Sequence, residues 1–298
     1  MRVAITGPTG SIGQELISLH LSKGDEVIAI LNPSSSRKNE FSKDDNLTFY
    51  ECDISNYQSL TKDDSCDVFY HLAWAGSGPE SRNDVFLQSN NVKFALDAVK
   101  LSREWGAKHF IGTGSQAEYG LLNKKIDSQT PANPVTPYGI CKYTAGKLCK
   151  CLCEEYGIYF NWARILSVYG RYDRPDTLIS YLIKSFVNGI RPELSPCEQM
   201  WNLMYAEDCA EALAAITEKG VYGKTYVVAS KDSRPLKEFV MELKGIIAPS
   251  MSIEFGTKPY YKNQTMYLSA DISDLVKDTG FEPQFSFKEG IRRILSHN

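Results

Sequence analysis

The sequence predicts an α/β fold, a doubly wound parallel sheet with helices on both faces and a smaller C-terminal lobe. Three observations support this prediction. Apolar strand segments alternate with helical segments from the first residues onward, these strand segments are short apolar runs, and a glycine-rich turn directly follows the first of them. Strands of a parallel sheet are buried on both faces and therefore have this character, and right-handed crossovers between them give a doubly wound sheet.

The elements are expected in a regular order over the first half of the chain. The helix over 11–22 has Ile12, Leu16 and Leu19 on one side, which is the spacing of an amphipathic helix. Two longer helices are expected at 81–105 and 138–156. The expected strands are 2–6, 26–31, 47–51, 67–72, 108–112 and 159–166.

The alternation becomes looser after about Val168, where arginines, prolines and shorter elements follow. We interpret residues 1–167 as a nucleotide-binding domain that includes the helix over 138–156. Residues 168–298 are expected to form mainly a substrate-binding lobe, partly interleaved with the sheet. Its expected helices are 178–188, 206–219, 236–247 and one at the end of 269–297, and its expected strand is 224–228.

Composition excludes several classes of protein. A net charge of -3 over 298 residues, with 43% apolar residues, is typical of a soluble globular chain and gives no basic excess for binding nucleic acid. No apolar run approaches the ~18 residues that span a membrane. The chain begins directly with a strand segment instead of a secretory signal, so we expect a cytoplasmic protein.

Three cysteines alternate at Cys149, Cys151 and Cys153 within an expected helix. Cys149 and Cys153 then share a face, while Cys151 points elsewhere, and no nearby histidine completes a metal site. We therefore expect no metal here and interpret these residues as small side chains in a reducing compartment.

The turn after the first strand carries Gly7, Gly10 and Gly13 in the spacing G-x-x-G-x-x-G. Backbone N–H groups at the start of a helix bind a pyrophosphate closely only where side chains do not block the approach. Three glycines are also compatible with a purely structural turn, but their place between a strand and a helix favours a dinucleotide cofactor.

The end of the second strand indicates which dinucleotide is bound. Position 32 is Asn, where NAD-specific sites usually carry an acid, and Ser34, Ser36, Arg37 and Lys38 follow it. Hydroxyl donors and a guanidinium suit a 2′-phosphate, so the sequence favours NADP(H) over NAD, although an ordinary solvated loop would have the same composition. Asp53, at the end of the third strand, is positioned to accept from the adenine amine.

The run Tyr138-x-x-x-Lys142 places two functional side chains on one face of a helix. An ammonium beside a phenol favours the phenolate, so we expect Lys142 to lower the pKa of Tyr138 and make it an acid–base group. Ser115 follows the fifth strand and is expected to hydrogen-bond the same substrate oxygen. These three residues are the predicted catalytic set, for chemistry at a carbonyl or carbinol carbon.

These residues give the chain a resemblance to a known family. It resembles the extended short-chain dehydrogenase/reductases that act on nucleotide sugars as epimerases, dehydratases and ketoreductases. The matching segments cover nearly the whole chain: 6–13, Asp53-Ile54, His71-Leu72-Ala73, Asn91, Ser115 with Tyr119-Gly120, Tyr138 with Lys142, Arg164, 168–170, 208–210, 271–273 and 280–283. The resemblance implies a seven-stranded Rossmann-type sheet, a nucleotide-sugar substrate and a homodimer packed through the long helices.

The resemblance also implies the residues of each site. The cofactor residues are expected to be Gly7, Thr9, Gly10, Ser11, Ile12, Gly13, Asn32, Ser34, Ser36, Arg37, Asp53, Ile54, Leu72, Ala73, Trp74, Asn91, Thr113, Tyr138, Lys142 and Ile165. The substrate residues are expected to be Ser77, Ser115, Gln116, Ser167, Arg174 and Thr177. Candidate cations for the substrate pyrophosphate are Arg164, Arg171, Arg174 and Arg191, and the role of Glu118 stays open between substrate contact and a structural bond.

Departures from the family's subgroups narrow the chemistry. The dehydratases carry Asp and Glu where this chain has Gln116 and Ala117, which disfavours 4,6-dehydration. The absence of a cysteine after Ser115 disfavours C3/C5 epimerisation. The sequence favours NADPH-dependent reduction of a 4-keto-6-deoxyhexose nucleotide, with an NAD-dependent 4-epimerase as the alternative. A non-catalytic NADP(H) sensor is disfavoured because the catalytic set is complete.

Overall fold

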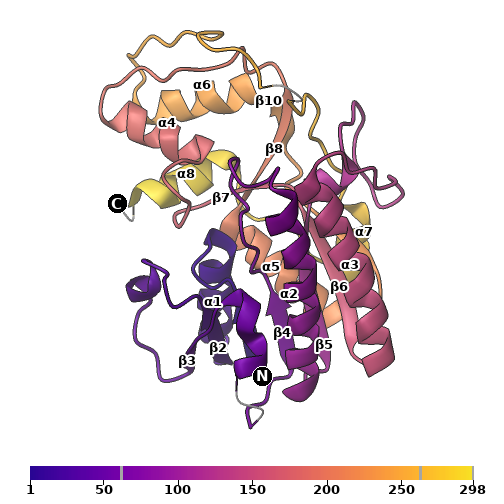
Figure 1. Cartoon of the computed structure of the whole chain (residues 1–298). Helices are drawn as coiled ribbons and strands as arrows, with labels where there is room; N and C mark the ends of the chain where they lie inside the picture. The colour runs from indigo at the N-terminus through magenta and orange to yellow at the C-terminus, as the bar shows by residue number, and fades with distance from the viewer. Residues whose placement is uncertain (61–62, 262–263, 297–298) are drawn as a thin grey trace.

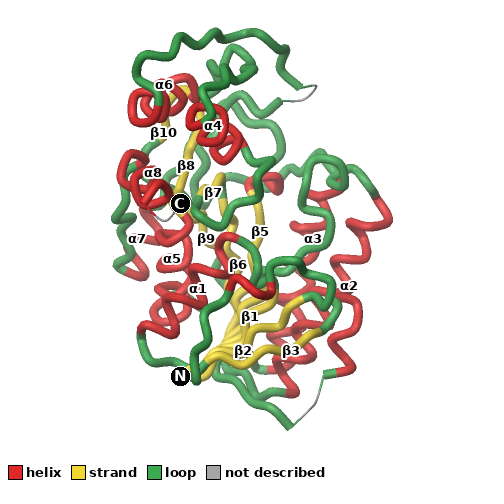
Figure 2. Tube along the Cα trace, turned by 90° about the vertical axis from the view of Figure 1, so that its left-hand side faces the viewer, coloured by secondary structure: helices red, strands yellow, loops and turns green. Residues whose placement is uncertain are grey.

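A seven-stranded parallel sheet forms the centre of the molecule (Figures 1 and 2). The structure, a computed structural model, describes residues 1–60, 63–261 and 264–296. The strand order is β3-β2-β1-β4-β5-β6-β9, which reverses direction between β1 and β4 and confirms the doubly wound, Rossmann-type fold. The strands are β1 (Arg2–Thr6), β2 (Glu26–Leu31), β3 (Leu47–Glu51), β4 (Val68–His71), β5 (His109–Ser115), β6 (Tyr159–Ile165) and β9 (Thr225–Val228).

Helices cover both faces of this sheet, so every strand except the edge strand β3 is buried along most of its length. Val3 and Ile5 of β1 pack on the face of α1 (Ser11–Ser22) and α5 (Ala206–Lys219). Ala4, between them, packs on the opposite face, where α2 (Val85–Glu104) and α3 (Pro137–Tyr156) lie side by side (Figure 1).

The helix α2 begins four residues later than the sequence predicts. The Asp84 carboxylate caps it by accepting from Leu87 N at 3.0 Å, so residues 81–84 belong to the preceding loop. The helix α3 has a clear start and end: Thr136 accepts from Gly139 N at 3.2 Å, Pro137 occupies the first turn, and Gly157 ends the helix in the left-handed conformation with φ of 70°. Tyr138 is thereby fixed in the first turn of α3.

A second, three-stranded sheet lies above the first one in Figure 2, with the order β10-β8-β7. Its strands are β7 (Ser167–Tyr169), β8 (Met200–Tyr205) and β10 (Ser233–Pro235), none of which the sequence predicted. With α4 (Leu178–Val187), α6 (Leu236–Ile247) and α8 (Phe287–Ser296) it encloses a separate apolar cluster. No helix in the described ranges is long and apolar enough to cross a membrane.

The remaining elements are short. The segment predicted to end in one helix contains two, α7 (Ser273–Thr279) and α8, because Gly280 takes a left-handed conformation between them; His297, the predicted last residue of that segment, lies outside the described residues. Three short 3₁₀ helices complete the list: η1 (Lys38–Glu40), η2 (Ile54–Ser59) and η3 (Gln116–Tyr119).

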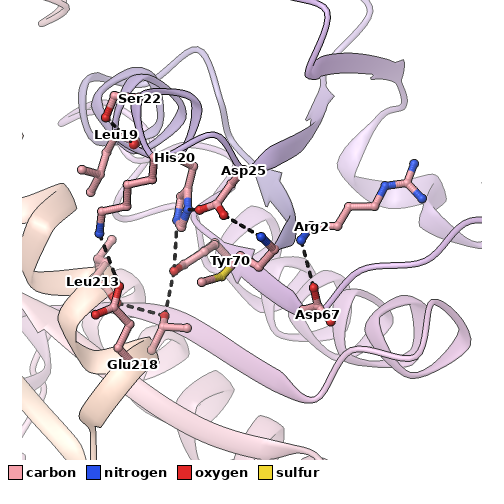
Figure 3. A network of polar contacts seen from close by, with 12 residues as sticks. Arg2, Leu19, His20, Ser22, Asp25, Asp67, Tyr70, Leu213 and Glu218 are labelled. Carbon is pink, nitrogen blue, oxygen red and sulfur yellow. Dashed lines mark hydrogen bonds and ion pairs between the residues drawn. The ribbon is translucent and has the colours of Figure 1, made fainter.

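A buried polar network holds α1 in place at the amino end of the sheet (Figure 3). His20 Nδ1 lies 2.8 Å from Asp25 Oδ2, and His20 Nε2 lies 3.2 Å from Tyr70 Oη, which also accepts from Thr217 at 2.7 Å. Burial lowers the pKa of His20, although Asp25 opposes this shift. The neutral imidazole is therefore favoured, and it joins Asp25 to Tyr70 by hydrogen bonds. The network joins α1 to β4 and α5 and so orients the start of α1 toward the carboxyl ends of the strands.

Candidate active site

Of the three glycines in the turn after β1, only Gly10 has room for a side chain. Gly7 has φ of +70°, and a Cβ atom there would lie 2.8 Å from Ala73 N, while a Cβ atom at Gly13 would lie 2.4 Å from Gly7 O. Both glycines are therefore required by the protein's own packing. A Cβ atom at Gly10 would have Gly7 O at 3.5 Å as its nearest neighbour, an ordinary contact. The backbone at Gly10 is therefore open to approach at the start of α1, where helix N–H groups favour an anion such as a pyrophosphate.

Polar side chains gather where β2 and β3 end, at the expected adenosine side of the cofactor site. Asn32 Nδ2 donates to Asp53 Oδ2 at 2.9 Å, and Asn32 Oδ1 accepts from the backbone N and the hydroxyl of Ser34. Asp53 also accepts from the Ser55 hydroxyl and backbone N, and these bonds lower its pKa. Asp53 is therefore an anion fixed beside Asn32.

The cations that favoured NADP(H) in the sequence are paired with carboxylates in the structure. Arg37 forms an ion pair with Glu40 at 2.8 Å and donates to Tyr172 O at 2.8 Å. Lys38 lies 3.3 Å from Glu51 Oε1. The sequence did not predict the pairing with Glu40 and Glu51, because it depends on how the loop after β2 folds back on itself. Ser36 remains exposed in the same loop.

Ser115, Tyr138 and Lys142 meet at the carboxyl end of β5. The Ser115 side chain lies near the Tyr138 phenol and acts to lower its pKa. Lys142 Nζ donates to Thr113 O at 2.8 Å and lies 3.9 Å from the centre of the Trp74 ring. The Trp74 and Tyr138 rings meet edge to face, with centres 6.0 Å apart. The sequence spacing therefore corresponds to a spatial cluster able to hold one substrate oxygen.

The electrostatics of this cluster differ from the sequence expectation. Burial raises the pKa of Tyr138, while the charge of Arg82 and the nearby Ser115 side chain oppose that rise. Burial also lowers the pKa of Lys142 to about 7, with Glu118 opposing. The expected lowering of the Tyr138 pKa by Lys142 is therefore outweighed by desolvation of both groups.

Two candidate pyrophosphate cations are engaged elsewhere. Arg164 Nε lies 2.6 Å from Glu118 Oε2 in a buried ion pair, and Glu118 Oε1 accepts from Ser115 N at 2.8 Å. Arg171 pairs with Glu15 at 2.9 Å. Glu118 therefore forms structural bonds behind Ser115, which favours the structural one of its two expected roles. Arg164 and Arg171 are both paired with buried carboxylates and do not face a substrate phosphate as free cations.

Two of the expected cofactor residues, Asn91 and Thr113, form hydrogen bonds to backbone atoms of the site. The buried Asn91 amide bonds to Ala75 N at 2.8 Å and Ala75 O at 2.9 Å, and so fixes the turn after β4. Thr113 Oγ1 donates to His71 O at 3.1 Å. His71 Nδ1 lies 2.9 Å from Thr6 Oγ1, and burial lowers the pKa of His71 to about 3. Its buried Nε2 has no hydrogen-bond partner among the described residues.

A cavity of about 260 Å³ opens beside Tyr138. Gln116, an expected substrate residue, lines it. Arg82, in the loop before α2, also lines it and was missed because that loop was predicted to be helical. Ser77, in the same loop, accepts from Arg82 Nε through its backbone O at 2.8 Å.

A second cavity, of about 420 Å³, lies in the C-terminal lobe. Aromatic side chains, Lys258 and the amide of Gln199 line it. Gln199 is 5% exposed, and its Oε1 has no hydrogen-bond partner within the part of the chain that is described. A buried acceptor in a cavity wall indicates a ligand that carries a donor.

Arg174 lies between the loop before α2 and the segment that lines the lobe cavity. Its guanidinium lies beside Gly78 of the loop before α2, and Pro175 and Asp176, which follow it, line the lobe cavity. Thr177, at the start of α4, donates to Arg174 O at 3.1 Å and lies next to this segment. Ser167 lies in β7, and Arg191 is exposed beyond α4.

Comparison with known proteins gives a consistent pattern. The profile of the NAD-dependent epimerase/dehydratase family matches residues 3–229. An uncharacterised UDP-glucose epimerase of Bacillus subtilis is 24% identical, covering 100% of this chain and 98% of its own. The UDP-glucuronate 4-epimerase of Thermodesulfobacterium geofontis is also 24% identical, covering 98% and 94%.

Solved structures agree in fold. The UDP-glucose 4-epimerase of Thermotoga maritima, solved with UDP-glucose, has a TM-score of 0.89 at 22% identity and covers 100% of this chain and 98% of its own. The UDP-glucuronic acid 4-epimerase of Bacillus cereus, solved with NAD, has a TM-score of 0.85 at 21% identity and covers 100% and 96%.

Proposed function

This chain belongs to the NAD-dependent epimerase/dehydratase family, and we propose that it inverts the configuration at C4 of the hexose in a nucleotide sugar, with NAD retained through the cycle. The observation that carries the proposal is the cluster of Ser115 and Tyr138 at the end of β5, with Tyr138 at the wall of the 260 Å³ cavity and Lys142 behind it. Gln116 and Ala117, which follow Ser115, provide no further acid or base, so the site suits a reaction at one carbinol carbon.

Each residue has a separate task in this reaction. Tyr138 takes the proton of the C4 hydroxyl and later returns it, and Ser115 hydrogen-bonds the same oxygen. Lys142, fixed by Thr113 and Trp74, supports the cofactor side of Tyr138. Bound NAD supplies hydride transfer at C4. Inversion requires that the sugar turn in its cavity while the nucleotide stays anchored.

The lobe cavity provides that anchor. Tyr181 and Trp201 offer ring faces for a base, and the buried Gln199 Oε1 accepts from a base N–H. Lys258 supplies positive charge for the diphosphate between base and sugar. Two named relatives act on uridine nucleotide sugars, and we infer a substrate of that class.

NAD suits the site better than NADP(H). A 2′-phosphate at the end of β2 would meet Glu40, Glu51 and the anionic Asp53, whose charges offset Arg37 and Lys38. Reduction of a 4-keto-6-deoxyhexose nucleotide, which the sequence favoured, thereby loses the support that it drew from these two cations. A reductase also has to release its cofactor in every turnover, whereas an epimerase recovers it.

We also propose a homodimer formed through α2 and α3. Val85, Phe86, Ile140 and Leu148 are large apolar residues of these helices that are at least 43% exposed. Light scattering of the purified protein tests this: a mass of one chain, 33.4 kDa, would contradict it.

Analysis of the nucleotide carried by the purified protein, followed by turnover without added cofactor, tests the proposed function. We expect NAD to be released on denaturation, and UDP-hexoses to be converted to their C4 epimers. The Tyr138→Phe variant should retain NAD and lose turnover, while Tyr143→Phe on the same helix should keep it. NADPH-dependent reduction of a 4-keto sugar nucleotide, with no epimer formed, would restore the reductase hypothesis.

A further inference from the structure

Arg82 lies directly over the ring of Tyr138, with its guanidinium carbon 4.8 Å from the ring centre. It is held from two sides. Its Nε donates to Ser77 O at 2.8 Å, and its own backbone O accepts from Tyr138 N at 3.1 Å. The loop before α2 thus places the Arg82 guanidinium beside the first turn of α3. The two hydrogen bonds hold this guanidinium over the Tyr138 ring.

The other arginines near this edge of the sheet are neutralised by carboxylates. The pairs are Arg37–Glu40, Arg164–Glu118, Arg171–Glu15 and Arg174–Asp176. Within residues 1–60, 63–261 and 264–296, Arg82 forms no ion pair. It is also the one charged side chain among the described residues that line the 260 Å³ cavity. The cavity therefore has a net positive wall beside the catalytic tyrosine.

We propose that Arg82 binds a carboxylate at C6 of the hexose, so that the substrate is a nucleotide-linked uronic acid. The proposal rests on the proposed function, which places the C4 oxygen at Tyr138 and Ser115. C6 is attached to C5, the neighbour of C4, so its substituent lies within a few ångströms of the Tyr138 ring. A guanidinium binds a carboxylate through two parallel hydrogen bonds, and a methyl or hydroxymethyl group leaves it without an anion.

Uncharged donors in the same wall complete the site. Gln116, Thr136 and Thr265 line the cavity together with Arg82. Their amide and hydroxyl groups can donate to the carboxylate oxygens that the guanidinium leaves free. No carboxylate side chain of the described residues lines this cavity, so nothing there repels an anionic sugar.

Binding to a protein that cannot turn over is the direct test. In the Tyr138→Phe background, which retains the ring beneath Arg82, the affinities for UDP-glucuronate and UDP-glucose are measured by calorimetry. The two ligands differ only at C6. We expect UDP-glucuronate to bind about tenfold or more tightly, the range of a charge-assisted pair. Adding Arg82→Gln should remove the preference.

A matched control separates this effect from general loss of charge. Arg103 also lies over a tyrosine, 4.1 Å from the centre of the Tyr156 ring at the far ends of α2 and α3. Arg103→Gln in the same background should keep the full preference. Equal affinity for the two ligands, or no measurable affinity for either, overturns the proposal, as does an Arg82→Gln change that weakens both ligands alike.

Turnover distinguishes this inference from the proposed function. With Tyr138 intact, Arg82→Gln should lower kcat/KM for UDP-glucuronate by about tenfold or more relative to that for UDP-glucose, because the effect of the Arg82 charge on the pKa of Tyr138 is common to both substrates. Epimerisation of UDP-glucose with no preference for the uronate would support the proposed function and overturn the role of Arg82. Preferential binding of the uronate without epimerisation of either sugar would support Arg82 and overturn the proposed function.

Discussion

Glu118 and Arg164 form a buried ion pair directly behind the candidate catalytic Ser115, with 2.6 Å between Glu118 Oε2 and Arg164 Nε. The other oxygen of Glu118 accepts from Ser115 N at 2.8 Å and from Trp162 Nε1 at 3.0 Å. One carboxylate therefore joins β6 to the end of β5 and fixes the backbone from which the Ser115 hydroxyl projects. Its role in the site is to position Ser115.

Glu118→Gln should destabilise the protein strongly. The amide keeps a hydrogen-bond acceptor but leaves the buried Arg164 charge uncompensated, which costs on the order of 3–5 kcal/mol. Urea unfolding followed by circular dichroism measures the loss in free energy of unfolding. Glu154→Gln is the control, because Glu154 pairs with Lys150 at 3.8 Å on the exposed side of α3 and its loss should cost less than about 1 kcal/mol. Equal losses would contradict the structural role of Glu118.

Gly10→Ala and Gly13→Ala should separate cofactor binding from folding. At Gly10 the added methyl group makes an ordinary 3.5 Å contact and enters the space for the pyrophosphate, so we expect a normal melting temperature and at least about tenfold weaker NAD binding. At Gly13 it would lie 2.4 Å from Gly7 O, so we expect a lower melting temperature. Thermal unfolding and fluorescence titration with NAD measure both effects. Unchanged NAD affinity in Gly10→Ala would remove the turn from the cofactor site.

The parts of the fold that could be predicted are those with a local pattern. The strands 2–6, 26–31 and 47–51 and the helices 11–22 and 206–219 have the predicted bounds, because an apolar run or an amphipathic repeat defines them without tertiary contacts. The second sheet was not predicted, since β7 and β10 have three residues each and are too short to show alternation.

The nearness of Tyr138 and Lys142 could be predicted because the two residues are one helical turn apart. The ion pairs that neutralise the charges around the candidate site could not be predicted. Which acid neutralises Arg37 depends on the fold of the loop that brings Glu40 back to it. Arg82 was hidden because Ser81 looked like the beginning of the helix, whereas Asp84 takes the capping position and leaves Arg82 in the loop over Tyr138.

Glu40→Gln should shift cofactor preference toward NADP(H). The change leaves the Arg37 guanidinium without its carboxylate and removes one negative charge near the expected 2′-phosphate. We expect the ratio of NADP to NAD affinity to rise by about threefold to tenfold, as for a partly exposed charge. Fluorescence titration with both dinucleotides measures the ratio. Glu155→Gln removes the same charge from the exposed end of α3 and should leave the ratio unchanged. No change in Glu40→Gln would show that this loop does not determine the choice.

Lys142→Met should stabilise the cofactor-free protein at pH 7 while abolishing turnover. Burial lowers the pKa of Lys142 to about 7 from 10.5. Between these values the unfolded chain binds the proton and the folded chain does not, so the contribution of Lys142 to the free energy of unfolding increases as pH rises. At pH 7 and below, the folded protein carries the full cost of the buried ammonium. The variant should therefore be more stable than the wild type at pH 7, and the difference should narrow toward pH 9.

The expected narrowing is about 1–2 kcal/mol over those two pH units, given a limiting slope of about 1.4 kcal/mol per unit. Urea unfolding of both proteins at pH 7, 8 and 9 measures it, and groups common to both proteins cancel in the difference. Lys147→Met, at an exposed position of the same helix, should show a difference from the wild type that is independent of pH. If the Lys142→Met difference is also constant, Lys142 remains charged throughout the range, and its ammonium, together with the guanidinium of Arg82, is available to lower the pKa of Tyr138.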